Sequence, residues 1–120
     1  MNDIKEIARE DIIIKISNLQ KTLSDKEVEW SKNITDLKKL ERYLESSDIE
    51  RTAYELELQM IDNEDYLKIE NIKFNLDDID SVQQTCEFKI SIFQTKIDSV
   101  KAQIKAIQKS IQFLSDKLNT

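Results

Sequence analysis

The 120-residue sequence contains no glycine, no proline and no histidine, and it has a single cysteine. Tight hairpin turns and phosphate-binding loops need glycine, so its absence argues against an all-β fold and against a nucleotide-binding α/β fold. Without histidine there is no imidazole base, no histidine-activated nucleophile and no histidine-containing metal site. We therefore expect an all-α protein that is not an enzyme, with no catalytic residue, no cofactor and no bound metal.

The sequence predicts neither a disulfide bond nor a membrane span. Cys86 has no second cysteine to pair with, which favours a reducing, intracellular setting. The longest uninterrupted apolar run is Ile12, Ile13 and Ile14, whereas a membrane-spanning helix needs about 20 residues. Because the first residues are charged, we expect no secretory leader. We expect a cytoplasmic protein that does not insert directly into a membrane.

Charge is distributed unevenly along the chain. Residues 41–80 hold 13 acidic and 4 basic side chains, whereas residues 81–120 hold 6 basic and 3 acidic ones. The six lysines after residue 80 are spaced like a basic stripe, but no arginine follows Arg51 and the pattern does not make the aromatic-interleaved basic groove of a nucleic-acid-binding protein. The acidic segment would repel phosphate. We expect no nucleic-acid binding.

The strongest pattern is a heptad repeat in the C-terminal half. Fifteen positions follow one another at alternating spacings of three and four residues, and Gln83 is the only one that is neither apolar nor a thiol. Such a sustained repeat predicts a coiled-coil helix, about 75 Å long at 1.5 Å per residue. The positions are Ile69, Ile72, Leu76, Ile79, Gln83, Cys86, Ile90, Phe93, Ile97, Val100, Ile104, Ile107, Ile111, Leu114 and Leu118.

A second, less regular seam runs through the N-terminal half. Lys26 and Asn33 interrupt it, and we interpret both either as residues that set the alignment of the helices or as sites where the packing is locally looser. Trp30 is the largest side chain in this seam, and we expect its indole NH to find a nearby acceptor. The apolar positions of the seam are Ile12, Ile16, Leu19, Leu23, Trp30, Leu37, Leu40 and Leu44.

Polar residues between the two seams suggest where the chain changes direction. Ser47 and Glu50 have the spacing of a capping box, which predicts that a helix restarts near residue 48. Residues 62–65 form the most polar stretch, and we expect an Asn or Asp there to take the left-handed turn conformation in place of glycine. If Ile12 pairs with Leu118, the midpoint falls beside this stretch, at residue 65.

These observations predict an all-α fold: a long antiparallel two-helix coiled-coil hairpin with a short helical segment at its tip. The whole chain, residues 1–120, forms a single coiled-coil domain. The first helix covers about residues 3–45, the tip about 46–66 with a shorter helix at about 48–61, and the second helix about 67–118. Because the two seams pair within one chain, we expect a monomer when the protein is free.

Two groups of residues are candidates for binding partners. At the end where the termini meet, apolar side chains lie off the seams and could dock in a hydrophobic socket of a larger assembly. At the tip, acidic side chains should attract a basic partner. The first group is Ile4, Ile7, Ile14 and Phe113, with Leu114, Lys117 and Leu118 beside them, and the second is Glu55, Glu57, Asp62, Glu64 and Asp65.

In this arrangement, and in the segments Glu6–Gln20 and Ser110–Leu118, the chain resembles the stalk proteins of type III secretion systems and their flagellar export counterparts. The resemblance implies a non-enzymatic cytoplasmic protein whose paired termini insert into the pore of a hexameric export ATPase. Its tip would face the export gate protein at the membrane base of the secretion apparatus. The stalk would couple ATP hydrolysis to protein export.

Two other interpretations remain open at this point. A small helical secretion chaperone or adaptor would hold a partner helix against a seam that stays unpaired within its own chain. A homodimeric structural coiled coil would have no hairpin, and Lys26, Asn33 and Gln83 would set the register between two chains.

Overall fold

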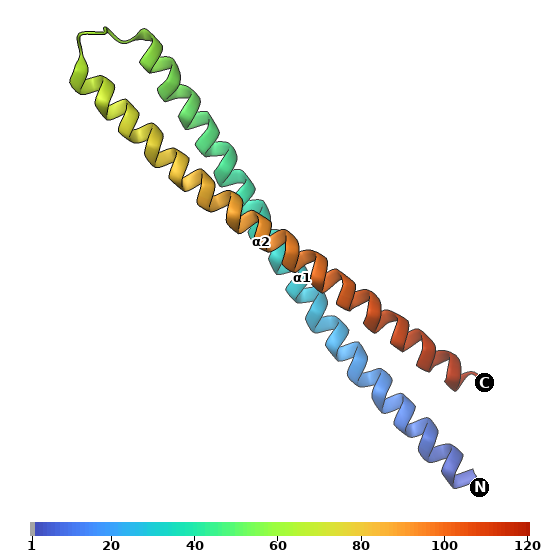
Figure 1. Cartoon of the computed structure of the whole chain (residues 1–120). Helices are drawn as coiled ribbons and strands as arrows, with labels where there is room; N and C mark the ends of the chain where they lie inside the picture. Colours follow the sequence, from blue (N-terminus) through green and yellow to red (C-terminus); the bar gives the residue numbers. More distant parts are fainter. Residues whose placement is uncertain (1) are drawn as a thin grey trace. The chain divides into compact units, whose positions relative to one another are not determined.

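The computed structural model describes the backbone of residues 2–120 and the side chains from Lys5 onward. Two helices, α1 (Asn2–Met60) and α2 (Tyr66–Leu118), make up nearly all of that range, and it contains no strand. They run antiparallel and are joined by a short turn (Figure 1). The predicted all-α helical hairpin is confirmed. Helices of this length are possible because no proline removes a backbone donor and no glycine weakens the helix interior.

The contacts within the chain divide it into two compact units. Unit 1 combines the residues of α1 up to Ile34 with Thr95–Thr120, and unit 2 is the continuous segment Thr35–Gln94. In each unit a stretch of α1 packs along a stretch of α2. Both chain ends therefore belong to unit 1, and the turn belongs to unit 2.

The heptad seam predicted for α2 is confirmed at every position. None of its fifteen residues is exposed, and Ile72, Ile79, Gln83, Cys86 and Val100 are buried. The other ten are half-buried, because a single neighbouring helix covers only one side of each seam residue. Cys86 is a free thiol that packs as a small apolar side chain.

The helix break predicted near residue 48 is wrong, because α1 continues without interruption to Met60. The seam of α1 keeps its alternating spacing past Leu44, and the residues that carry it on are Ser47, Arg51, Tyr54 and Leu58. These four are shielded from solvent, while every residue between them is exposed. Ser47 is buried in the seam instead of capping a helix. The supposed tip helix is therefore the last part of α1, whose repeat was hidden by two polar seam residues.

The turn lies where the polar stretch predicted it, between Met60 and Tyr66. Asp62 organises it: its carboxylate accepts a hydrogen bond from the Glu64 amide at 3.2 Å, and its carbonyl accepts one from the Asp65 amide at 3.0 Å. The Asp65 carboxylate accepts a bond from the Lys68 amide at 3.4 Å, the position of an N-cap for α2. The expected left-handed residue is not there, since no described residue has a positive φ. Side-chain hydrogen bonds make this turn in place of an unusual backbone conformation.

The two polar residues that interrupt the α1 seam in unit 1 make no side-chain hydrogen bond to α2. Lys26 and Asn33 are both half-buried, and the Lys26 amino group pairs with Glu29 of the same helix at 3.3 Å. Trp30 is half-buried beside them. The acceptor expected for its indole NH is missing, because Nε1 is buried without a hydrogen-bond partner. Leaving such a donor unpaired costs about 1–3 kcal/mol.

Candidate functional site

Apolar side chains at the chain ends of unit 1 lie open to solvent. Ile7, Ile14 and Phe113 are each 57–59% exposed. All three are off the seams, so the packing of α1 on α2 does not cover them. The side chain of Ile4 lies outside the described residues. A group of large apolar side chains that stays exposed marks a surface for interaction with another molecule.

A hydrogen bond defines where the pairing of the two helices ends. The Arg9 guanidinium donates to the carbonyl of Leu118 at 3.3 Å, which satisfies one of the orphan carbonyls at the C-terminus of α2. Since α2 ends at Leu118, the turn of α1 before Arg9 has no helix beside it in unit 1. Ile7 lies in that turn. Ile7 is nevertheless about as exposed as Ile14, which lies on the same side of α1 seven residues later, so its exposure comes from its position off the seam.

The other predicted residues at this end behave differently. Leu114 and Leu118 occupy seam positions and are half-buried against α1, so they support unit 1 from within. Lys117 is exposed, and its amino group lies 5.0 Å from the centre of the Phe113 ring. This cation–π contact orients Phe113 while leaving most of the ring open. The apolar side chains that stay open at the chain ends are therefore Ile7 and Ile14 on the side of α1 opposite its seam, and Phe113 on α2 with Lys117 beside it.

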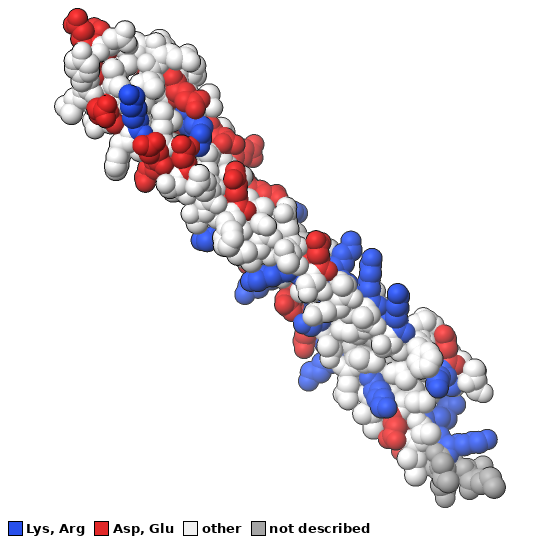
Figure 2. Space-filling view, in the orientation of Figure 1, with Lys and Arg blue, Asp and Glu red and all other residues white. Residues whose placement is uncertain are grey.

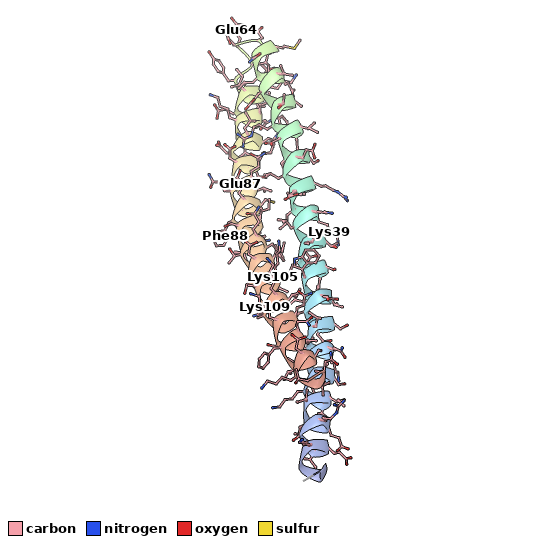
Figure 3. All side chains as sticks on the ribbon, turned by 90° about the vertical axis from the view of Figure 1, so that its right-hand side faces the viewer. Lys39, Glu64, Glu87, Phe88, Lys105 and Lys109 are labelled. Atoms are coloured by element: carbon pink, nitrogen blue, oxygen red, sulfur yellow. The ribbon has the colours of Figure 1, made fainter. Side chains whose placement is uncertain are left out.

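The acidic residues predicted at the tip are all exposed and all belong to unit 2. They are Glu55, Glu57, Asp62, Glu64 and Asp65. Figure 3 shows Glu64 at the turn, and Lys105 and Lys109 on the part of α2 that belongs to unit 1.

The two units differ strongly in charge. Residues 35–94 hold 15 acidic and 7 basic side chains, a net charge of −8, whereas the sequence of unit 1 has a net charge of +2. Acidic side chains gather around the turn in the space-filling view (Figure 2). The negative charge of unit 2 therefore favours binding of a basic partner, whereas the slightly positive charge of unit 1 does not.

Sequence reasoning missed a polar network in the seam of unit 2. Arg51 donates hydrogen bonds through Nη2 to Asp80 and to the side-chain oxygen of Gln83. Gln83, which is 7% exposed, donates in turn to the Asp48 carboxylate at 2.6 Å. Buried Ser47 lies one turn before Arg51 on the same seam. The signal that could have found this network is the continued spacing of 47, 51, 54 and 58 after Leu44.

Two kinds of feature are absent from the part of the chain that the structure describes. This part contains no cluster of three or more acidic or cysteine side chains that could hold a metal ion. No helix in it is both long enough and apolar enough to cross a bilayer.

Comparison with known proteins identifies no family and no relative for this chain. No protein-family model matches the chain, and neither the curated proteins nor the solved structures contain a significant match.

Proposed function

We propose that the chain is a non-enzymatic stalk protein, the central stalk of a type III secretion ATPase. Unit 1 would enter the pore of the hexameric ring, where Ile7, Ile14 and Phe113 would bury their exposed surfaces. The observation that carries the proposal is the exposure of these three side chains in the unit that holds both chain ends. Burying the exposed part of one such side chain contributes about 1–2 kcal/mol, since complete burial is worth about 1.5–3 kcal/mol and somewhat more than half of each side chain is exposed.

The pairing of the seams supports a stalk over the two alternatives. A chaperone that holds a client helix needs an unpaired seam, and the seam residues of α1 and α2 are shielded by each other in both units. A homodimer without a hairpin would take its seam contacts from a second chain. Here Gln83 of α2 is bonded to Asp48 and Arg51 of α1 in the same chain.

The acidic turn would serve the second partner of a stalk. Glu64 and its acidic neighbours are exposed, so they can pair with basic side chains of a partner. In this proposal that partner is the export gate protein, which would need a basic surface at the contact. In this proposal the protein acts in the cytoplasm at the base of the secretion apparatus and couples ATP hydrolysis to protein export.

The test is stimulation of a purified hexameric export ATPase from the same organism. Ile14→Asp and Phe113→Asp place a carboxylate in the proposed socket, and we expect each to lower the apparent affinity of the chain for the ring by about tenfold or more. Val28→Asp is the matched control, because Val28 is exposed on the outward side of α1 in the same unit. Leu114→Asp is unsuitable, since Leu114 supports the seam and its loss would unfold unit 1.

The proposal fails if wild-type protein leaves the ATPase rate unchanged at saturating concentration. It also fails if Val28→Asp is as damaging as Ile14→Asp and Phe113→Asp. Reversing the charge of Glu64 should leave ATPase stimulation intact, because the turn contacts the other partner.

A further inference from the structure

The side of α1 that faces away from α2 carries an apolar stripe in unit 2. We define the outer face as Ile49, Thr52, Ala53, Leu56 and Met60, all of which are exposed. Ile49 and Leu56 occupy the heptad position opposite the seam, where soluble coiled coils normally carry polar residues. The exposed fractions of Ile49, Leu56 and Met60 are 70%, 54% and 87%. The packing of unit 2 gives no reason for apolar side chains at these positions.

The spacing of the outer face is that of a helix-binding surface. Its members follow one another at i, i+3, i+4, i+7 and i+11, which places them along one side of about three helical turns. Ala53 and Thr52 are small, so a partner backbone can approach closely at the centre. The Thr52 hydroxyl already donates to the carbonyl of Asp48 at 3.0 Å. An apolar partner would therefore leave no new donor unpaired there.

Acidic side chains border the outer face on both sides. Asp48 and Glu55 lie along one edge, and Glu50 and Glu57 lie along the other, all of them exposed. Arg51 is the only basic residue between positions 45 and 60, and it is turned into the seam, where Asp80 and Gln83 hold it. Within this segment of α1 the border of the outer face thus keeps its negative charge, and the next basic residue of the helix is Arg42, seven residues before Ile49.

We propose that the outer face binds a basic amphipathic helix of a partner protein. The apolar side of that helix would cover Ile49, Leu56 and Met60, and its lysines or arginines would flank the stripe and face the two acidic edges. Charge complementarity selects this occupant, because flanking charges decide which helices pair. A second copy of the outer face would bring acidic edges against acidic edges, which opposes self-association through this surface.

This proposal does not depend on the stalk function, and its test uses the chain without any ATPase. The probe is a synthetic helical peptide of about 18 residues, built from leucine and lysine so that the leucines form one stripe. Binding is measured by isothermal titration calorimetry at physiological salt. A peptide of the same composition in scrambled order keeps the charge but loses the stripe.

Two kinds of variant separate the apolar contribution from the charge contribution. Leu56→Ser removes a large apolar side chain from within the stripe. A second variant removes charge from the edges by combining Glu50→Gln, Glu55→Gln and Glu57→Gln. We expect each to weaken peptide binding by about tenfold or more. Val28→Ser is the matched control for Leu56→Ser, since it changes an exposed residue at the same heptad position in unit 1. Far-UV circular dichroism verifies that every variant keeps its helices.

The expected result is one peptide bound per chain, unchanged affinity in Val28→Ser, and weak binding of the scrambled peptide. Equal affinity of Leu56→Ser and wild-type protein would overturn the proposal. So would equal binding of the scrambled peptide, which would show attraction by charge alone. A wild-type dimer in sedimentation equilibrium that dissociates in Leu56→Ser would assign the outer face to a second copy and would overturn it as well.

Discussion

The Arg51 guanidinium of α1 donates a hydrogen bond through Nη2 to the side-chain oxygen of Gln83 in α2, so polar residues of two facing seams are bonded to each other. Nε of the same guanidinium is buried without a hydrogen-bond partner. The side-chain amide nitrogen of Gln83 donates a second hydrogen bond, to the carboxylate of Asp48 in α1. A slip of either helix by one turn would place these polar groups against apolar seam residues, where they would lose their partners. The network therefore selects one alignment of α1 and α2 in unit 2.

Removing the central member of this network should destabilise the protein. Gln83→Leu leaves Arg51 and Asp48 without their shared partner, and we expect the free energy of unfolding to fall by about 1–2 kcal/mol. The double variant Arg51→Met/Gln83→Leu replaces the polar pair by apolar side chains and should recover most of that loss. Urea unfolding followed by circular dichroism gives the free energies, and a double-mutant cycle gives the coupling. Strictly additive effects would show that the two side chains do not act together.

The continuity of α1 can be tested at Asp48. If a helix began there after a Ser47 cap, proline at position 48 would occupy the first helical position, where it is well tolerated. In an unbroken helix the same proline removes a backbone hydrogen bond and costs about 3 kcal/mol or more. We expect Asp48→Pro to be strongly destabilising in thermal unfolding. Asp48→Ala is the control that removes the bond to Gln83 without disturbing the backbone, and a similar melting temperature for the two variants would contradict a continuous α1.

The start of α2 depends on the Asp65 side chain. Asp65→Ala removes the acceptor of the Lys68 amide, and we expect a loss of about 0.5–2 kcal/mol in the free energy of unfolding. Asp65→Ser keeps an oxygen in the same place and should retain most of the stability. Chemical unfolding of the three proteins under identical conditions measures the difference. If the serine variant were as unstable as the alanine variant, the carboxylate would not be acting as an N-cap.

Most of the fold could be predicted because its seam residues are apolar. From Ile69 to Leu118 a single polar residue interrupts the repeat, and a pattern of that kind can be satisfied only by a helix that packs along one side. The seam of α1 was predicted only as far as Leu44. Ser47 and Arg51 follow at the correct spacing, but as polar residues they look like a break until Gln83 and Asp80 are known to lie opposite them.

The candidate surfaces were predictable to different degrees. Ile7, Ile14 and Phe113 stand off the repeat, so their exposure could be expected from spacing alone. The outer face could not, because residues 46–66 were assigned to a tip in which no heptad position was defined. Once α1 is continuous, Ile49 and Leu56 fall opposite the seam and their exposure follows.

By itself the sequence determined the all-helical character, the seam of α2 and the place of the turn. The absence of glycine and proline, the regular spacing of apolar residues and the polar stretch 62–65 act locally, within one helix or one turn. Only the tertiary structure decided that α1 runs unbroken to Met60, because the polar seam residues are stabilised by partners on the other helix, about 30 residues away along the chain. Tertiary structure likewise decided that Ile49 and Leu56 remain uncovered, since their position opposite the seam is defined only when α1 continues past residue 48.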